Sequence, residues 1–331
     1  MRSARSQAGL SLIELMISIT LGLMILSGVA FVFVNTSQAR NEIERTSRQI
    51  ENGRYAIELL TDDIALAGYY GELDVGALTA PGALPTDQCS VDPGLWLTWI
   101  PLHIQGFDSG TGFNAATCAL TNHKAGTDVL VLRRTRTCVA GTTGCDAVAA
   151  GNPYVQVSLC STEADLNRIG VEGTATFDLK QNDCTNAAVK RQYYVHIYYI
   201  STDNGSGANV PTLKRIALEG TSWTTTPLVE GIEQMNLVYG VDTTVPADGS
   251  PDTYKAAPAN ITEWLNVVSV QIYLLARNLE TSPDYTDTKT YNLGIDSAGT
   301  AVTVTPGGNY RRHIYSSVVR LNNPAGRKDT P

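Results

Sequence analysis

The chain has 331 residues, 43% of them hydrophobic, so it can bury a sizeable core as one large domain or two small ones. Its formal net charge is −8, and it has no basic patch with interleaved aromatic residues, which argues against nucleic-acid binding. The charge is unevenly placed, because Arg2 and Arg5 are the only charged side chains before Glu14.

The first predicted element is a membrane-spanning helix. Residues 15–34 form a run of twenty without a charge, which is long enough to cross a bilayer. Basic residues on the short N-terminal side place that end in the cytoplasm, so the chain after Val34 is expected in the periplasm. The alternative is an ordinary secretory signal peptide. It is disfavoured because the run is longer than a usual apolar signal region, lacks a small-residue cleavage site at its end, and has Glu14 at its start.

Glu14 gives the N-terminus a more specific interpretation. A carboxylate at the mouth of an apolar helix is costly to desolvate, so it either lies near the interface or has a purpose. The stretch GLSLIELM, residues 9–16, follows a basic leader and opens the apolar run. This combination of glycine, hydrophobic residue, glutamate and uninterrupted apolar run resembles the type III signal of type IV prepilins.

The prepilin resemblance implies roles for three residues. In that family a peptidase cuts after the glycine, the new N-terminal amine is methylated, and a glutamate five residues into the mature chain faces the amine of a neighbouring subunit. Cleavage is therefore expected between Gly9 and Leu10, methylation on Leu10, and an assembly role for Glu14. Most family members have Phe where Leu10 stands, and the peptidase tolerates other apolar residues there.

The helix is expected to continue beyond the membrane, from residue 10 to about residue 67, because no proline occurs before Pro81. Gly68 would then end it. Two series recur at heptad spacing: Ile43, Ile50, Ile57 and Ile64, and Thr46, Gly53, Leu60 and Ala67. The pattern fits a coiled-coil dimer or a helix packed on the protein's own sheet. Gly53 and Thr46 would make a weak coiled-coil seam, so packing on the sheet is favoured.

The rest of the chain is interpreted as a β-rich head. Segments rich in β-branched, aromatic or alternating apolar residues predict strands at 128–134, 193–200, 213–218, 228–239, 267–277 and 310–321. Segment 228–239 is expected to carry a turn or helix start before its strand. In segment 267–277 the even positions are all apolar, which predicts one buried face.

All six cysteines lie in residues 71–191, hereafter the Cys-rich stretch, which is interpreted as an insertion or elaborated edge exposed on the head. An even number of cysteines in a chain that looks exported favours disulfides over free thiols. A zinc site is the alternative, but the closest pair has the wrong spacing for a zinc knuckle. Sequence does not fix the connectivity, and we expect neighbours to pair: Cys89 with Cys118, Cys138 with Cys145, and Cys160 with Cys184.

Three stretches of the carboxy half are similar to PilW-type minor pilins, relatives of the J-type minor pseudopilins of type II secretion. They are LVEGIEQMNLVYGVD (228–242), WLNVVSVQIYLLAR (264–277) and YRRHIYSSVVRLNN (310–323). The resemblance implies an α+β, pilin-like fold, in which a long N-terminal helix packs on a β-rich head with two antiparallel sheets. Residues 1–9 would be the leader, 10–34 the transmembrane and filament-core helix, 35–68 the amphipathic helix, and 69–331 the periplasmic head.

The same resemblance implies a function and partners. The protein would be a structural subunit that primes type IV pilus assembly and lies at or near the pilus tip. Its partners would be prepilin peptidase, an inner-membrane assembly platform, other minor pilins, the major pilin and a large tip adhesin. It would first lie in the inner membrane and then in the pilus at the cell surface. The alternatives are a minor pseudopilin of type II secretion, and a tip-displayed adhesion module whose Cys-rich stretch contacts a surface.

No sequence pattern indicates catalysis. The four histidines are far apart in the chain, and the nucleophile elbow, phosphate loop and dinucleotide-binding motifs are absent. The adjacent carboxylates Asp62 and Asp63 are interpreted as solvated on a charged helix face. His196 is interpreted as a core or edge residue of its strand. We therefore expect no enzyme activity and assign no catalytic residue.

One weak metal candidate remains, and no other cofactor is expected. Asp242, Asp248 and Asp252 lie in a loop with Gly and Pro, and clustered carboxylates of this kind can hold Ca²⁺. The spacing does not match an EF-hand, and the intervening residues dilute the acidic charge. A plain solvated loop is the favoured interpretation.

Overall fold

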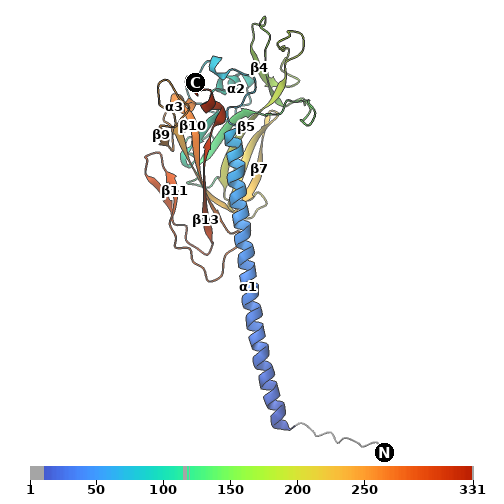
Figure 1. Ribbon diagram of the computed structural model, residues 1–331, viewed down its shortest axis with the longest axis vertical. Coiled ribbons are helices and arrows are strands. Elements are labelled where there is room, and N and C mark those ends of the chain that lie inside the picture. The colour runs from blue at the N-terminus through green and yellow to red at the C-terminus, as the bar shows by residue number, and fades with distance from the viewer. Residues whose placement is uncertain (1–10, 115–117, 119, 330–331) are drawn as a thin grey trace, which may run out of the picture. The chain divides into compact units, whose positions relative to one another are not determined.

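A computed structural model of the protein describes residues 11–114, 118 and 120–329 (Figure 1). Its longest element is the helix α1 (Leu12–Ala65). The chain divides into two compact units, Met1–Arg48 and Gln49–Pro331, and α1 contributes residues to both. The absence of proline from this stretch allows one helix of 54 residues, close to the predicted extent.

In the second unit, α1 buries one face against strands of the head. The buried residues of α1 are Gln49, Gly53, Ala56, Leu60, Asp63 and Ile64. The expected packing on the protein's own strands is therefore present, but the isoleucine series does not form its seam, since Ile50 is 38% exposed. A straight α-helix turns once every 3.6 residues, so a strict seven-residue series drifts around its surface.

Gly68 directs the chain from the helix into the head. α1 ends at Ala65, and Gly68 has a φ of +73°, a conformation that residues with a side chain seldom adopt. The backbone N–H of Gly68 donates to the carbonyl oxygen of Arg133 at 3.0 Å. The predicted helix end is therefore anchored directly to a strand.

Seven of the described strands form an antiparallel sheet around β5 (Lys190–Ser201). β5 pairs with β2 (Val129–Thr135), with β3 (Pro153–Val157) and with β6 (Thr212–Glu219). Three further strands extend the sheet: β1 (Ile104–Phe107) beside β2, β4 (Asn167–Val171) beside β3, and β7 (Ser222–Glu230) beside β6. The strands predicted at 128–134, 193–200 and 213–218 are β2, β5 and β6.

A second antiparallel sheet has the order β13 (Arg312–Arg320), β10 (Val267–Arg277), β8 (Ile232–Val241) and β9 (Thr253–Lys255). β10 lies beside β13 over nine residue pairs (Figure 1). A separate hairpin joins β11 (Tyr291–Ile295) to β12 (Ala301–Val304). The fold class is thus α+β with a long N-terminal helix and two principal antiparallel sheets, as predicted.

Short helices complete the head: η1 (Val75–Ala77), α2 (Pro93–Trp99), η2 (Asp108–Gly110), α3 (Ile261–Leu265) and α4 (Asn322–Gly326). Local sequence explains where two of them begin. Asp92 caps α2 by accepting from the N–H of Gly94 at 2.9 Å, and Pro93 occupies the first turn. Asn260 caps α3 by accepting from the N–H of Glu263 at 3.0 Å.

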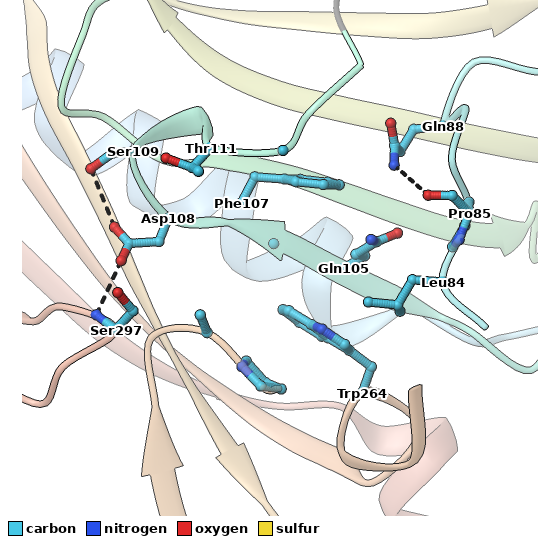
Figure 2. Close-up of a pocket in the computed structure, with 14 residues that line it drawn as sticks. Leu84, Pro85, Gln88, Gln105, Phe107, Asp108, Ser109, Thr111, Trp264 and Ser297 are labelled. Atoms are coloured by element: carbon cyan, nitrogen blue, oxygen red, sulfur yellow. Dashed lines mark hydrogen bonds between the residues drawn. The ribbon is translucent and has the colours of Figure 1, made fainter. Parts of the chain in front are cut away.

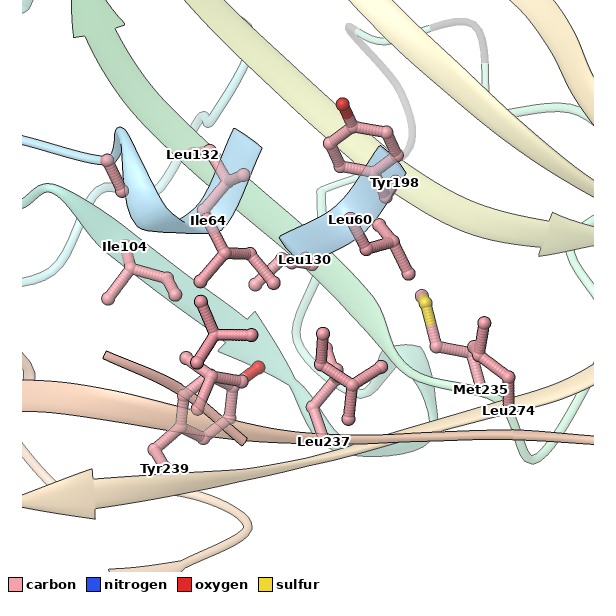
Figure 3. Close-up of a cluster of buried hydrophobic side chains, with 14 of the residues drawn as sticks. Leu60, Ile64, Ile104, Leu130, Leu132, Tyr198, Met235, Leu237, Tyr239 and Leu274 are labelled. Carbon is pink, nitrogen blue, oxygen red and sulfur yellow. The ribbon is translucent and has the colours of Figure 1, made fainter. Parts of the chain in front are cut away.

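The main core lies where α1 meets both sheets. Figure 3 shows Leu60 and Ile64 of α1 beside Leu130 and Leu132 of β2, with Met235, Leu237 and Tyr239 of β8 nearby. A second cluster combines residues of η1 and α2 with the alternate residues of β2 and β5, including Trp96, Val131 and Tyr193. The central strands β2 and β5 are therefore buried on both faces.

One expectation for the head was wrong. The Cys-rich stretch is not an added edge, because β1, β2, β3 and β4 belong to the seven-stranded sheet and Leu130 is fully buried. β2 matches the strand predicted at 128–134, whereas β1, β3 and β4 are short and separated by turn-rich loops, which hides their periodicity. Segment 228–239 carries the turn that the sequence predicted as one of two possibilities, because Gly231, with φ +81°, joins β7 to β8.

Candidate assembly site

The described part of the assembly site is the first turn of α1. The backbone N–H groups of Glu14 and Leu15 donate to the carbonyl oxygen of Ser11 at 3.0 and 3.1 Å. The Ser18 hydroxyl donates to the Glu14 carbonyl oxygen at 2.7 Å. A carboxylate is favoured here by the positive end of the helix dipole, so Glu14 also fits a plain helix start. Gly9 and Leu10, the predicted cleavage and methylation residues, lie outside the described residues.

Beyond Glu14, α1 presents an apolar surface. Its large apolar side chains between Leu15 and Val34 are 50% to 72% exposed, and an 18-residue window reaches a mean hydropathy of 2.4 with none of it buried. Removing one such side chain from water is worth about 1.5–3 kcal/mol. The helix is long and apolar enough to cross a membrane, and this surface favours a bilayer or another apolar environment over water.

The Glu14 carboxylate has no hydrogen-bond or ion-pair partner among residues 11–114, 118 and 120–329. A charge that enters an apolar medium alone costs several kcal/mol, and a paired opposite charge offsets much of that cost. If α1 is buried in lipid or in a filament, the partner must come from outside the described part of this chain. A first-turn carboxylate on a helix in water needs no such partner, so the requirement for one distinguishes Glu14 from an ordinary helix start.

The head carries three disulfides, and all six cysteines are described. The structure joins Cys89 to Cys118, Cys138 to Cys145, and Cys160 to Cys184, with Cα–Cα distances of 5.5, 5.8 and 4.9 Å. These are the neighbour pairs expected from the sequence. Cys89 and Cys118 are buried in the second core cluster, where the Trp223 indole N–H donates to the Cys89 carbonyl oxygen at 2.7 Å.

The three aspartates of the calcium candidate accept hydrogen bonds from the loop backbone, and Asp242 and Asp252 share the N–H of Thr244. Buried Asp242 accepts from the N–H of Gly249 at 2.8 Å. Asp252 accepts from the N–H groups of Thr243 and Thr244 at 2.7 and 3.0 Å, and Asp248 accepts from a nearby backbone N–H. Within the described residues, no three His, Cys, Asp or Glu side chains form a group that could hold a metal ion. The hydrogen bonds of the three carboxylates stabilise the loop.

Each histidine contacts a different group. His103 is buried, lies within 3.2 Å of the Pro101 carbonyl and 3.0 Å of the Val267 carbonyl, and burial lowers its pKa to about 4. His123 lies beside the Thr127 carbonyl, and the His313 ring packs on Tyr315. His196 is buried on β5, as its interpretation as a core or edge residue implied. Its Nδ1 lies 2.6 Å from the Asp63 carboxylate, so the four histidines lie in four different environments.

One interpretation on the helix was wrong, because Asp63 is buried while Asp62 is exposed. Asp63 lies in a cluster with Arg134, His196 and Tyr198, which come from β2 and β5. The sequence gives two adjacent aspartates, and they differ because Asp63 lies on the buried face of α1 and Asp62 on its exposed face. The spacing of Asp63 from Leu60 and Ala67 was the available signal, since it places Asp63 on the packed side.

Two stretches of the chain match known protein families, one at the N-terminus and one in the carboxy half. Residues 4–30, which include Gly9, Leu10 and Glu14, match the family model described as the prokaryotic N-terminal methylation motif. Residues 197–323, from β5 into α4, match the family model of the type IV pilus-assembly protein W, PilW. No curated protein matches the chain.

A solved structure is also similar: the type IV-like pilin TTHA1219 from Thermus thermophilus, at 16% identity and a TM-score of 0.31, covering 60% of this chain and 78% of that one. The chain has a PilW domain and the N-terminal methylation motif, together with an exposed apolar helix and a disulfide-bonded β-rich head. These features support a minor pilin of the PilW type.

Proposed function

We propose that this protein primes the assembly of a type IV pilus and lies at or near the pilus tip. The observation that carries the proposal is Glu14, a carboxylate without a partner in the described chain at the start of an exposed apolar helix. The methylation motif around Glu14 and the PilW domain of the head support it. Prepilin peptidase, an inner-membrane assembly platform, the major pilin, other minor pilins and a large tip adhesin are the partners that belong to this proposal.

The assembly role is electrostatic. Cleavage between Gly9 and Leu10 would free an amine at Leu10, and in an apolar filament core this amine and the carboxylate of a neighbour are each costly to bury alone. Pairing them offsets much of that cost. Because Glu14 requires an amine from another subunit, we place the protein close to the tip but with a further subunit above it. An outermost subunit would have no amine to pair with its carboxylate.

The test is complementation of a strain that lacks the protein, using wild type, Glu14→Ala and the control Glu51→Ala, which changes an exposed carboxylate of α1 in the second unit. Surface pili are counted by electron microscopy and protein abundance is measured by immunoblot. We expect few pili with Glu14→Ala and wild-type numbers with Glu51→Ala. Wild-type pilus numbers with normal amounts of Glu14→Ala would refute the pairing role. Loss of type II secretion with intact pili would favour the pseudopilin alternative.

A further inference from the structure

Two features of the head have no part in the proposed assembly site, and the first is a cavity of about 470 Å³ (Figure 2). Its walls come from a loop, β1 and α3, and they include Gln105 and Trp264. Asp108 also lines the cavity, and its carboxylate already accepts from the Ser297 N–H at 3.0 Å and the Ser109 hydroxyl at 3.2 Å. This lining selects no particular ligand. The second feature, the outer edge of β13, is more specific.

β13 is the last strand of the four-stranded sheet, so among the described strands it has a neighbour on one edge only (Figure 1). Two backbone hydrogen bonds show which of its groups face that neighbour, β10. The Leu321 N–H donates to the Val268 carbonyl oxygen at 2.9 Å, and the Asn278 N–H donates to the Arg311 carbonyl oxygen at 3.0 Å. Both pairs continue the register of the two strands. Because bonded and non-bonded pairs alternate in an antiparallel ladder, the odd-numbered residues of β13 turn their N–H and C=O groups toward β10.

The even-numbered residues therefore turn their backbone groups outward. Along most of the strand these residues are Ile314, Ser316, Val318 and Arg320, and their N–H and C=O groups make no hydrogen bond with the described part of the chain. Ser316, Val318 and Arg320 are exposed, and Val318 is 64% exposed. A donor and an acceptor at every second residue is the pattern that pairs with another extended strand.

Nothing in the sequence of β13 protects this edge. Proteins usually protect an edge strand with charged side chains, proline, a bulge or a very short length. β13 has nine residues in uniform register with β10, and the stretch IYSSVV, residues 314–319, has neither a charge nor a proline. The edge is therefore open to the addition of a strand.

α1 places apolar side chains beside this edge. Gly53 lies against the Tyr315 ring of β13. Ile50 and Ile57 are three residues before and four residues after Gly53, so they lie on the same side of the helix. Ile50 is 38% exposed and Ile57 is only partly buried. The face of an added strand that points toward α1 would cover these two side chains, so apolar residues are favoured there.

Arg54 adds a preference for charge. Its side chain is exposed and makes no hydrogen bond or ion pair with the residues that the structure describes. Its positive charge acts on Tyr315, where it opposes the rise in pKa that burial causes. A carboxylate on the added strand would complement this charge. β13 itself carries Arg312, His313 and Arg320 but no carboxylate, so a second copy of β13 would bring like charges to the edge.

We propose that the outer edge of β13 binds an extended segment of a partner protein as an added antiparallel strand. On the face toward α1, this segment carries apolar side chains over Ile50 and Ile57 and a carboxylate that pairs with Arg54. Its opposite face lies beside Ser316 and Val318, where small polar residues suffice. This interaction surface goes beyond the proposed assembly role and does not depend on it.

The binding test uses the full-length protein in a zwitterionic detergent and synthetic peptides labelled with fluorescein. The probe has nine residues that alternate valine and threonine, with glutamate in place of the central valine, and fluorescence anisotropy measures its affinity. Valine and glutamate then share the face toward α1, and the threonine N–H groups point at β13. N-methyl groups on the threonines should abolish binding, whereas N-methyl groups on the valines should not. Any other pattern, or no binding of the glutamate probe, would overturn the proposal.

Variants of the protein test the same contacts. Ser316→Pro removes an outward N–H without removing a bond to β10 and should weaken binding about tenfold, while the control Ser316→Ala keeps that N–H and should bind like wild type. If the proline variant does not fold, the methylated peptides still decide the question. Equal affinity of a folded Ser316→Pro and wild type would overturn the proposal.

Charge reversal tests the predicted carboxylate. A probe with lysine in place of glutamate should bind wild type roughly fivefold more weakly, and Arg54→Glu should reverse this preference. A preference that Arg54→Glu leaves unchanged would show that the edge does not select a carboxylate. Sedimentation of the protein alone provides the remaining comparison, because dimers that Ser316→Pro abolishes would assign the edge to a second copy and overturn the proposal.

Discussion

Asp63 on α1 accepts a hydrogen bond from the Nε of Arg134 on β2 at 2.6 Å, and this ion pair ties the helix to the seven-stranded sheet. The second carboxylate oxygen of Asp63 lies 2.6 Å from the His196 Nδ1 and accepts from the Tyr198 hydroxyl at 2.7 Å. Both side chains of the ion pair are largely buried, at 14% and 8% exposure. One carboxylate thus joins α1 to two neighbouring strands.

Replacing Asp63 should unfold the head more easily. Asp63→Ala leaves the Arg134 guanidinium buried beside an apolar side chain, and breaking a buried pair in this way costs about 3–5 kcal/mol. The exposed neighbour provides the control, since Asp62→Ala should change stability by no more than about 0.5 kcal/mol. Urea unfolding of the full-length protein, followed by tryptophan fluorescence, measures both. Equal midpoints for the two variants would show that the cluster contributes nothing.

The same cluster should make the protein sensitive to acid. Burial by itself would raise the pKa of Asp63, but His196, Arg134 and the Tyr198 hydroxyl together hold that pKa well below its usual 3.8. The unfolded chain therefore takes up this proton first as the pH falls. The stabilisation is fully present above about pH 4 and is lost as the pH falls toward the folded pKa. Below pH 4, stability should fall more steeply in wild type than in Asp63→Asn, and parallel curves would contradict this account.

Patterns within one element and the pairing of neighbouring cysteines could be predicted from the sequence, but side-chain contacts between distant elements could not. The even positions of segment 267–277 are all buried, as their apolar character predicted, and β10 has the predicted bounds, although Val267, Ser269 and Leu275 are buried as well. Asp63 meets Arg134 and His196 only after the sheet forms, at separations of 71 and 133 residues. The cavity around Gln105 combines a loop, β1 and α3, and no local pattern places those segments together.

The helix pattern shows a similar limit. The heptad series correctly indicated an amphipathic helix, but it did not decide which series faces the sheet. Gly53 helps to decide which face of α1 packs, because it lies against the Tyr315 ring of β13 and lets the helix approach that strand closely. Ile50 projects elsewhere and remains partly exposed.

Gly53→Ala tests that close approach. An added Cβ would overlap the Tyr315 ring, and such overpacking costs about 1–3 kcal/mol. The gain in helix propensity is about 1 kcal/mol and only partly offsets it. We expect a net loss of stability in the wild-type background. In a Tyr315→Ala background the same change should stabilise by about 1 kcal/mol. Stabilisation in both backgrounds would exclude a steric role for Gly53.

The three disulfides should contribute unequally. Chain-entropy estimates from the sequence separations of 29, 24 and 7 give about 3.6, 3.5 and 2.4 kcal/mol. Replacing both Cys160 and Cys184 by serine should therefore destabilise the head more than replacing both Cys138 and Cys145. Alkylation of the denatured, unreduced protein should label no cysteine. Two or more labelled residues would point to metal or redox chemistry instead.

Calcium removal should leave the head unaffected. The Asp242 and Asp252 carboxylates accept backbone hydrogen bonds from Gly249, Thr243 and Thr244, so the loop is held by its own donors. We expect the same thermal midpoint in EDTA and in millimolar Ca²⁺, while Asp252→Asn lowers it in both. A rise in the midpoint with Ca²⁺ that Asp242→Asn abolishes would establish the metal site.

The leader should be removed between Gly9 and Leu10. Glu14 then becomes the fifth residue of the mature chain, and the freed Leu10 amine becomes available for a neighbour's carboxylate. An uncleaved leader would bury that nitrogen in a peptide bond and place Arg2 and Arg5 beside an apolar segment. Intact mass spectrometry of protein from isolated filaments should show a chain that begins at Leu10 and carries one added methyl group.

Two variants separate processing from assembly. Gly9→Val places a branched side chain at the cleaved bond, and the longer precursor should accumulate in the inner membrane. Glu14→Ala keeps Gly9 and Leu10, so its membrane form should still be cut while pilus numbers fall. A mature chain that begins after Val34 would contradict the prepilin interpretation, because a secretory signal peptidase would then have removed the whole apolar run.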